Sequence, residues 1–408
     1  MKEKHNKINR RNFLKTMGAA GLGSVLASAE TNAADPTPST KTEEPKLPQV
    51  PRRKLGKTGV EVSCLALGTI FNVLENQILL RKSLEWGVTY WDTAHGYTGG
   101  NSERGIGKYL SKNPDVRKEL FIVSKASDAR TVADVEKLLQ TSLKRMNTNY
   151  IDLYYGVHGL EEPGQLTNEL KKWAESAKER KLIRFFGFST HDNMAECLAA
   201  AAKLDWIDAI MPMYNFRLMQ DDKMQDAVEA CHKAGIGLIA MKTQAKTIRT
   251  EEDKKLAQHF LQRGFTEGQA KVKIVLEDKR ISSACVGRDN LTHLQLNIAA
   301  VLDKTKLTQA DTKVFKEYAQ ATCTGYCAGC GHICSSVLPD APYVSKIMRY
   351  LMYYNSYGEQ KEARQLFAQI PGDVRNKLLS TDYSAAEARC PQHLQIAELM
   401  AEAVSKLA

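Results

Sequence analysis

Four ionisable side chains follow apolar, strand-like segments in the first half of this chain. Asp92 ends one such segment, and Tyr97 comes five positions later in a loop that contains glycine. Lys125 and His158 stand at the ends of the next two apolar segments. Because a barrel of parallel strands places its active site at the carboxyl ends of its strands, we expect these groups to gather in one pocket. Each alone would fit a surface ion pair or a structural role, whereas four at matched strand ends favour catalysis.

The elements that would position these groups alternate regularly along the chain. Residues 132–145 repeat apolar side chains on one helical face, and similar stretches separate the strands. A short hairpin within 53–62 is expected to cap the bottom of the barrel. Eight βα units predict an α/β fold of the (β/α)8 barrel type. Strands are predicted at 64–67, 89–92, 120–125, 151–157, 185–189, 209–213, 237–241 and 283–286.

Residues 51–302 resemble the aldo-keto reductase family. The resemblance begins at Arg53-Lys54-Leu55-Gly56-Lys57-Thr58-Gly59 and includes Leu67-Gly68-Thr69, the Asp-Thr-Ala-x-x-Tyr loop that starts at Asp92, Ser124-Lys125 and His158. It implies an oxidoreductase with a small carbonyl substrate and NADP(H) as the hydride donor. It also implies a catalytic tetrad of Asp92, Tyr97, Lys125 and His158.

Carbonyl reduction explains why these four residue types belong together. Hydride arrival at the carbon places negative charge on the oxygen, so a proton donor must lie within hydrogen-bond reach. Tyr97 is the predicted donor, and a neighbouring Lys125 ammonium is expected to bring the phenol pKa closer to working pH. Asp92 would hold Lys125 charged and fixed, while His158 would orient the carbonyl or share the proton.

The cofactor residues are predicted at the ends of later strands. No G-x-G-x-x-G motif follows a predicted strand, so a Rossmann unit is not expected. Phosphates in barrels usually lie at the loops after strands seven and eight, where Lys242 and Arg288 could neutralise them and Gly287 allows close approach. The family resemblance adds Thr69, Ser189, Tyr214 and Asn297. Thr190-His191, Met211 and the missing arginine before Asn297 depart from the family pattern.

Two further sets of side chains suggest a substrate pocket and a group of buried thiols. Phe71, Trp91, Phe216 and Met219 suggest an apolar, partly aromatic substrate pocket. Four cysteines stand singly in apolar or helical contexts and are expected to be buried structural thiols: Cys64, Cys197, Cys231 and Cys285.

The chain is longer than one barrel and begins with a basic segment. Its 408 residues exceed the ~250 of a typical barrel. Residues 1–29 contain Arg10-Arg11, a Gly/Ala-rich run and Ala27-Ser28-Ala29, which predict a twin-arginine signal peptide, the export machinery as a partner and a periplasmic location. An amphipathic or disordered tail is the alternative. Residues 30–50 are expected to be a linker, and neither membrane insertion nor nucleic-acid binding is indicated.

From residue 304 to 408 the strand pattern stops, and helices around cysteines are predicted. Cys327, Cys330 and Cys334 form one run, and Cys390-Pro391 stands alone. Ferredoxins use such runs, with a fourth cysteine that ligates the other cluster. The segment resembles the ferredoxin-type extension of some aldo-keto reductases, which implies one 4Fe-4S cluster on these four cysteines and a mainly helical, ferredoxin-like module.

Other interpretations of this module remain open at the sequence level. The same four thiolates could hold zinc, form disulfides in an oxidising compartment, or remain unligated, and Cys323 is left over in each case. The alternative for the whole chain is a non-catalytic barrel whose cysteine module docks a redox protein partner or binds another metal.

Overall fold

The structure, a computed structural model, describes residues 47–245, 250–287, 290–338, 340 and 343–408. The expected signal peptide, most of the expected linker and Arg288 lie outside these residues. The last residues of the linker pack on the barrel, since Val50 is buried and its N–H donates to the Trp86 carbonyl at 2.9 Å. The linker therefore ends earlier than the predicted residue 50.

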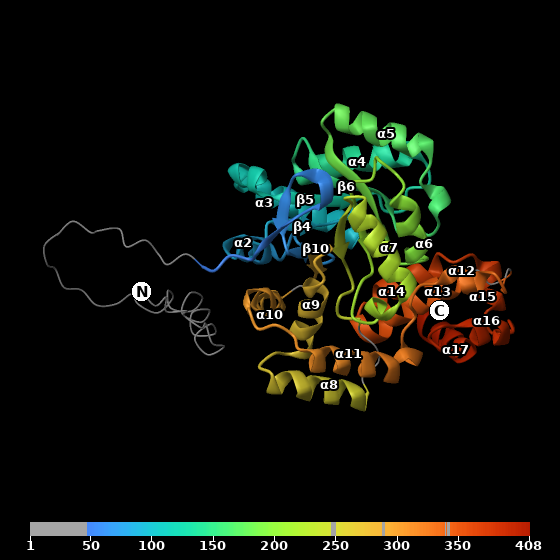
Figure 1. The fold of residues 1–408 in the computed structure, drawn as a ribbon. Helices are drawn as coiled ribbons and strands as arrows, with labels where there is room; N and C mark the ends of the chain where they lie inside the picture. Colours follow the sequence, from blue (N-terminus) through green and yellow to red (C-terminus); the bar gives the residue numbers. More distant parts are fainter. Residues whose placement is uncertain (1–46, 246–249, 288–289, 339, 341–342) are drawn as a thin grey trace, which may run out of the picture.

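Eight parallel strands close into a barrel in the order β10-β3-β4-β5-β6-β7-β8-β9. This confirms the predicted (β/α)8 barrel, and each predicted strand overlaps an observed one (Figure 1). The strands are β3 (Leu65–Gly68), β4 (Tyr90–Asp92), β5 (Phe121–Lys125), β6 (Ile151–His158), β7 (Ile183–Thr190), β8 (Ala209–Pro212), β9 (Gly237–Ala240) and β10 (Ile281–Val286).

Side chains fill the inside of the barrel, so its centre is a packed core. Tyr90, Phe121, Leu153, Tyr155 and other apolar residues form one buried cluster there. The bottom is closed by the expected hairpin, whose strands β1 (Arg52–Lys54) and β2 (Glu61–Ser63) pair antiparallel. A functional site of the barrel is therefore expected at the carboxyl ends of its strands.

Amphipathic helices cover the outside of the barrel. In α4, Val135, Leu139 and Leu143 face the strands, and Thr131 begins the helix with a capping box that includes Asp134. The helices of this layer are α2 (Gln77–Glu85), α3 (Asn101–Lys112), α4 (Val132–Met146), α5 (Asn168–Glu179), α6 (Met194–Ala201), α7 (Asp222–Lys233), α8 (Glu251–Gln262), α9 (Glu267–Glu277) and α10 (Leu291–Leu302).

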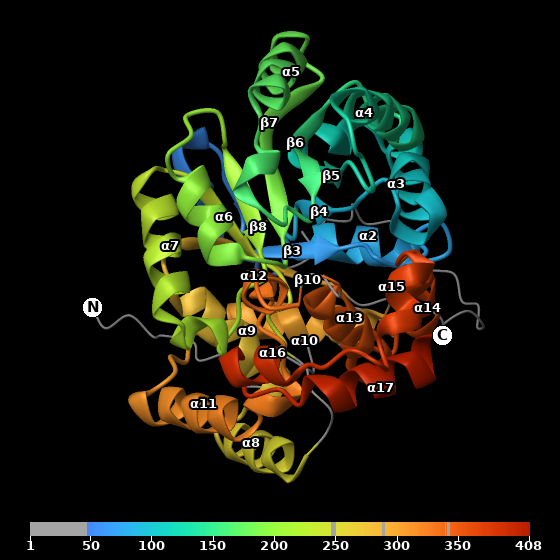
Figure 2. The same ribbon diagram turned by 90° about the vertical axis from the view of Figure 1, so that its right-hand side faces the viewer.

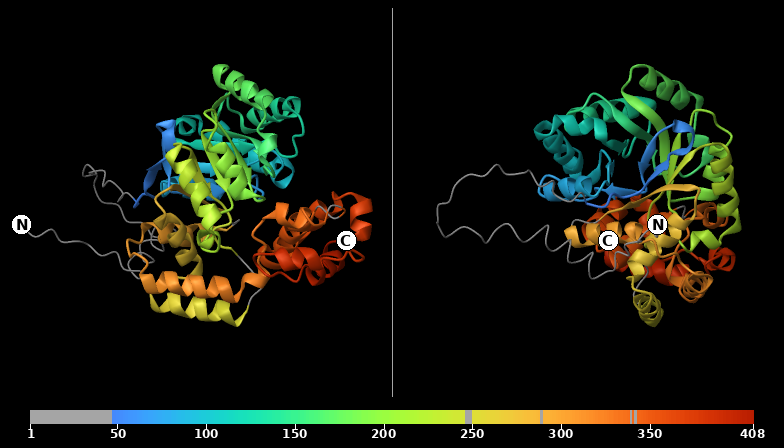
Figure 3. Two further views of the ribbon diagram at one scale, coloured as in Figure 1. Left: turned by 45° about the vertical axis from the view of Figure 1, so that its right-hand side comes forward. Right: turned by 60° about the vertical axis from the view of Figure 1, so that its left-hand side comes forward.

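The barrel core extends further along the chain than the predicted boundary at residue 304. Helix α11 (Gln309–Ala321) packs beside α8, and Figure 3 shows the two lying side by side. Phe315, Tyr318 and Tyr326 belong to the same buried cluster as the barrel helices. The division expected from the loss of strand pattern therefore falls after Tyr326, because α11 buries its apolar face against the barrel.

The remaining helices form a second, smaller body with its own core (Figure 2). No strand is present in this part of the described chain, as the sequence predicted. No described helix combines the length and apolar character that a membrane span needs. The helices are α12 (Gly331–Ser335), α13 (Val344–Met352), α14 (Gln360–Ala368), α15 (Gly372–Lys377), α16 (Ser384–Arg389) and α17 (Ile396–Leu407), with a π-helical turn at Tyr353–Tyr357.

This cysteine module, defined here as residues 327–408, contacts the carboxyl-end loops of the barrel. Arg349 forms an ion pair with Asp192, and Lys346 forms one with Glu161 at 2.8 Å. Gly329, at φ 80°, lies so close to the loop after β7 that a Cβ would collide with the His191 carbonyl oxygen. The module therefore sits on the face of the barrel where the predicted site lies.

Candidate active site

Lys125 lies at the centre of the predicted tetrad. Its side chain is 1% exposed, and its ammonium donates to Asp92 Oδ1 at 2.6 Å and to the Thr93 carbonyl at 2.8 Å. The Tyr97 hydroxyl lies 3.3 Å from the same nitrogen. Neighbouring strands β4 and β5 bring Asp92 and Lys125 together, which places the buried carboxylate and ammonium next to the part-buried phenol.

Asp92 and Lys125 each favour the charged form of the other. Burial is the largest single effect and lowers the pKa of Lys125, but the charge and hydrogen bond of Asp92, together with Tyr97 and Cys285, bring the net pKa above the usual value. Burial raises the pKa of Asp92, and Lys125 opposes that shift. The ammonium is therefore a fixed positive charge beneath the phenol.

Tyr97 keeps its proton in this environment. Burial raises the pKa of the phenol, and the opposing effect of Lys125 is smaller. The expectation that Lys125 brings this pKa towards working pH is therefore wrong for the structure as it stands, because desolvation of a phenolate outweighs one ammonium. A protonated phenol beside a cation is the form that can donate to a developing oxyanion.

A hydrogen bond with Ser127 orients the ring of His158. The Gly96 N–H donates to Ser127 Oγ at 3.0 Å, and Ser127 Oγ lies 3.0 Å from His158 Nδ1. Ser127 can donate its proton to Nδ1, and in that arrangement a neutral ring carries its own proton on Nε2. Burial, then the charges of Lys125 and Arg349, lower the pKa of His158 to about 3.

A further set of polar side chains braces the loop that carries Tyr97. Glu103 is fully buried, accepts from Ser124 Oγ at 2.7 Å, and pairs with Arg145 at 3.1 Å. The same guanidinium donates to the His95 carbonyl at 2.8 Å. This chain of contacts ties α3, β5 and α4 to the loop, so Tyr97 is held from several elements at once.

Cys285 differs from the other three isolated cysteines. Cys64, Cys197 and Cys231 are buried, as predicted, whereas Cys285 is partly exposed. It lies next to Asp92, whose charge contributes to a strongly raised pKa of the thiol, although burial is the larger cause. Cys285 is therefore a neutral thiol at the edge of the tetrad.

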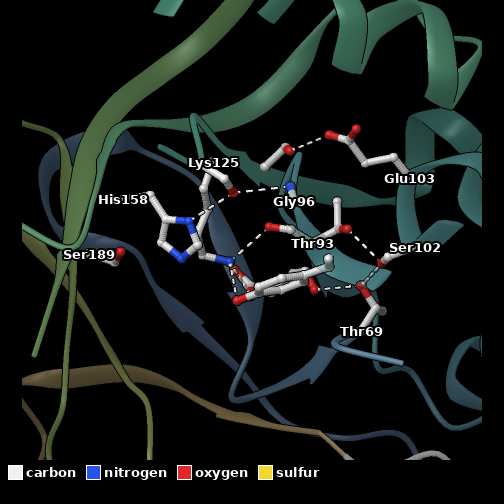
Figure 4. Close-up of polar contacts among 12 residues, drawn as sticks. Thr69, Thr93, Gly96, Ser102, Glu103, Lys125, His158 and Ser189 are labelled. Carbon is white, nitrogen blue, oxygen red and sulfur yellow. Dashed lines mark hydrogen bonds and ion pairs between the residues drawn. The ribbon is translucent and has the colours of Figure 1, made fainter. Parts of the chain in front are cut away.

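Thr69 and Ser189, two of the residues predicted to bind the cofactor, lie close to the tetrad. Thr69 Oγ1 contacts Ser102 Oγ at 2.7 Å and donates to the Asp92 carbonyl at 2.8 Å. Ser189 pairs in register with His158, and its hydroxyl accepts from the Gly159 N–H at 3.2 Å (Figure 4). These residues fit the end of a cofactor that approaches the tetrad.

The other predicted cofactor residues in the described chain are Lys242, Tyr214, Gly287 and Asn297. The Lys242 ammonium lies over the rings of Tyr353 and Tyr357 at 4.2 and 4.7 Å, so the cysteine module covers the predicted phosphate ligand. Tyr214 is fully buried, and its hydroxyl donates to Asp278 at 2.7 Å, outside the barrel interior. Gly287 approaches the Gly68 carbonyl closely, as expected of a tight loop, and Asn297 lies on α10.

The expected aromatic substrate pocket is not formed by the residues named for it. Trp91 is fully buried beside Tyr109, and Phe216 is fully buried against Phe315 and Tyr318. Both belong to the outer core between strands and helices. That part of the prediction is wrong for these two residues, because Trp91 points outward from β4 and Phe216, in the loop after β8, packs against α11.

The four cysteines singled out in the sequence line one cavity. Cys327, Cys330, Cys334 and Cys390 surround it together with Val344, Leu394 and Ile396, and it encloses about 310 Å³ including what opens to solvent. Cys323 does not line it. Burial and neighbouring thiols raise the pKa of Cys330 to about 12 and that of Cys334 to about 11. All nine cysteines of the chain are unpaired.

The described residues contain no group of three or more His, Cys, Asp or Glu side chains close enough to hold a single metal ion. The four cysteines thus line one space without forming such a group in the described chain. A tetrahedral zinc ion needs each sulfur at about 2.3 Å from a common centre, which this spacing does not provide.

No sequence motif marks several of the residues that shape the site. Ser127 lies two positions after Lys125 and orients His158, but an isolated serine carries no motif. Asp192 and Arg349 meet across 157 positions, so their pairing requires the tertiary structure.

Comparison with known proteins agrees with this geometry. Residues 70–320 match the family model of the aldo/keto reductase family. Similar proteins include L-galactose dehydrogenase of Arabidopsis thaliana, 23% identical across 62% of this chain and 89% of that protein. L-glyceraldehyde 3-phosphate reductase of Escherichia coli O157:H7 is 24% identical across 64% of this chain and 90% of that protein. The chain belongs to the aldo/keto reductase family, whose members are NADP-dependent oxidoreductases.

Solved structures show the same fold. A holo aldo-keto reductase from Bacillus halodurans superposes with a TM-score of 0.56 at 19% identity, covering 66% of this chain and 96% of its own. A thermostable aldo-keto reductase bound to the inhibitor epalrestat gives 0.55 at 27% identity, covering 65% and 99%. The family match ends at residue 320, before the cysteine module.

The hydrogen bonds of His158 predict its state in solution. Because its pKa is lowered to about 3, the ring should remain the neutral Nε2–H tautomer from about pH 8 to about pH 5, where a free imidazole would gain a proton. The unfolded chain does gain that proton near pH ~6.5, so His158 makes folding less favourable as pH falls from about 6.5 towards 3. Nitrogen NMR of ¹⁵N-histidine-labelled protein measures the tautomer directly.

Ser127→Ala is the control for this measurement. Loss of the donor to Nδ1 should give a mixture of the two neutral tautomers while the fold is kept. An imidazolium signal from His158 above about pH 5 would contradict the assignment.

Proposed function

We propose that this protein reduces a carbonyl compound to an alcohol with Asp92, Tyr97, Lys125 and His158 as its catalytic residues and NADP(H) as its hydride donor. The observation that carries the proposal is the buried contact of the Lys125 ammonium with both Asp92 and the Tyr97 hydroxyl. A cation, a protonated phenol and a neutral imidazole N–H are the groups that carbonyl reduction needs.

In this mechanism Tyr97 and His158 bind the carbonyl oxygen. As negative charge develops there, the Tyr97 hydroxyl transfers its proton to the oxygen, and the Lys125 charge stabilises the phenolate that remains. His158 donates through Nε2–H and holds the oxygen in line. Asp92 keeps Lys125 charged and in place throughout the reaction.

The cofactor supplies the hydride when it is bound. Thr69 and Ser189 are placed to hold its nicotinamide end, while Lys242 would reach its phosphates after leaving the rings of Tyr353 and Tyr357. The covered lysine also favours a second candidate: a barrel that does not turn over and serves as the scaffold on which the cysteine module docks a redox partner.

Tyr97→Phe tests the catalytic proposal. Loss of the proton donor should lower kcat for aldehydes and ketones by at least ~10²-fold with NADPH as donor, while the fold is kept because the ring stays. Steady-state turnover of a carbonyl panel is the measurement, with Tyr109→Phe as a control outside the tetrad. Equal activity in Tyr97→Phe would exclude Tyr97, and an inactive wild type with bound nucleotide would favour the scaffold.

We also propose that the cysteine module carries one 4Fe-4S cluster on Cys327, Cys330, Cys334 and Cys390. The shared cavity supports this set over others, since a four-iron cube occupies a space between its thiolates where a single ion requires a common point. The raised pKa values of Cys327, Cys330 and Cys334 mean that these three thiols carry protons, which iron must displace when it binds.

Iron and sulfide analysis of five single Cys→Ser variants tests the cluster. Anaerobically prepared wild type should hold about four irons and four sulfides per chain. Cys327→Ser, Cys330→Ser, Cys334→Ser and Cys390→Ser should each lose iron and lower the unfolding temperature of the module. Cys323→Ser is the matched control and should keep both; full iron content in Cys390→Ser with loss in Cys323→Ser would show that the first run alone forms the site.

We further propose that residues 1–29 direct export to the periplasm by the twin-arginine pathway, on the basis of Arg10-Arg11 and the Ala27-Ser28-Ala29 cleavage pattern. This route carries folded proteins, which suits a chain loaded with cofactors beforehand. Arg10→Lys with Arg11→Lys should leave uncleaved precursor in the cytoplasm. Cell fractionation with amino-terminal sequencing measures this, and mature double mutant in the periplasm would contradict it.

A further inference from the structure

One basic residue of the barrel faces two aromatic rings of the cysteine module. Lys242 comes two positions after β9, at the end of the barrel where phosphates usually bind. Its ammonium lies 4.2 Å from the centre of the Tyr353 ring and 4.7 Å from that of Tyr357. Both distances are within the range of a cation–π attraction. The rings therefore hold the charge that is predicted to neutralise the cofactor phosphates.

The module holds these two rings in place. Tyr353 and Tyr357 begin and end a π-helical turn, and their rings lie 6.2 Å apart at 82°. Within the turn Asn355 donates to Glu402 and accepts from Lys406, both at 2.9 Å, which ties the turn to α17. Single π-helical turns are rare but frequent at functional sites. The two rings are called the tyrosine clamp below.

Acidic side chains of the module lie in the same region. Burial, then the charges of Glu359 and Asp128, raise the pKa of Glu362, whereas the charge of Lys242 lowers it. Glu359 Oε2 is buried and has no hydrogen-bond partner within the described chain. A phosphate that approached Lys242 would meet these carboxyl groups together with ring faces, which carry the negative side of the aromatic quadrupole. The module thus offers Lys242 a negative partner of its own.

One ammonium cannot serve the rings and a phosphate at the same time. The lysine stem is flexible, so it can carry the charge from one partner to the other. A ligand whose binding-competent state is only partly populated binds with an affinity reduced by that population. The tyrosine clamp therefore lowers the affinity of the barrel for an anionic nucleotide.

We propose that Tyr353 and Tyr357 form an autoinhibitory clamp that competes with the phosphate groups of NADP(H) for Lys242. The inference rests on the proposed use of NADP(H) and adds how the cysteine module sets the affinity for it. The rings are the fixed partner, and the Lys242 side chain is the moving part. The module is then a regulator of the nucleotide site as well as the carrier of the four cysteines.

Replacing both rings tests the clamp. Tyr353→Leu with Tyr357→Leu removes the ring faces and keeps apolar side chains. The affinity of the full chain for NADPH should rise at least about fivefold, the size expected for the loss of one or two cation–π contacts. Tyr353→Phe with Tyr357→Phe is the matched control, because it keeps the ring faces and should bind NADPH as the wild type does. Nicotinamide fluorescence measures the dissociation constant.

Three further variants show where any gain comes from. In a Lys242→Met background the double Tyr→Leu change should not tighten NADPH binding, because no charge remains to be released. Glu161→Gln breaks the ion pair with Lys346 between module and barrel, leaves the rings in place and should keep the wild-type affinity. Tyr357→Leu alone changes the more exposed ring and should give a smaller gain in the same direction, which covers unfolding of the double variant.

Lysine NMR detects the clamp without turnover. Protons above a ring face are shielded, so the ε-protons of Lys242 in ¹³C-lysine-labelled wild type should resonate upfield of ordinary lysines. Lys242→Met identifies this signal, and saturating NADPH should return it to the ordinary position. A signal that stays upfield with NADPH bound would overturn the proposal. Folded Tyr→Leu variants that bind NADPH no more tightly than the wild type, or a chain that binds NADPH in no variant, would do the same.

The outcomes also separate the clamp from the proposed reduction. Tyr→Leu variants that gain NADPH affinity but reduce no carbonyl would leave the clamp and remove the reaction. NADPH-dependent reduction with equal affinity in the wild type and the Tyr→Leu variants would leave the reaction and remove the clamp.

Discussion

The buried ion pair of Lys125 and Asp92 is the interaction on which the rest of the site depends. Removing two charges from water is costly, and their attraction compensates only with close geometry and further hydrogen bonds. The 2.6 Å contact and the Thr93 carbonyl provide both. Loss of either partner would leave the other charge buried and unpaired. The pair thus constrains β4 and β5, and it places a permanent cation beneath Tyr97.

The cysteine module extends this arrangement beyond the barrel. Its contacts with the loops after β6, β7 and β9 bring Arg349 to the edge of the tetrad, where its charge helps keep His158 neutral. Cys327 lines both the cysteine cavity and a second, small cavity beside Asp192. Ser345 also lines both, so these two residues join the cysteine cavity to the contact between module and barrel.

Much of the fold and the composition of the tetrad could be predicted, and the errors share one cause. The strands were found because apolar runs bounded by helical patterns are a local property of the sequence. The pKa of Tyr97 was predicted in the wrong direction, since a neighbouring ammonium is visible as a residue type while desolvation depends on everything packed around the ring. Trp91 and Phe216 were assigned to a pocket for the same reason: the sequence does not show which layer a side chain enters.

The sequence by itself determined the barrel, the residue types of the tetrad at its strand ends and the set of four cysteines that separates from Cys323. Local periodicity and spacing carry this information. Only the tertiary structure decided that the module covers Lys242 and that Asp192 meets Arg349. Such contacts join residues more than a hundred positions apart, so they arise from the packing of complete surfaces and leave no pattern along the chain.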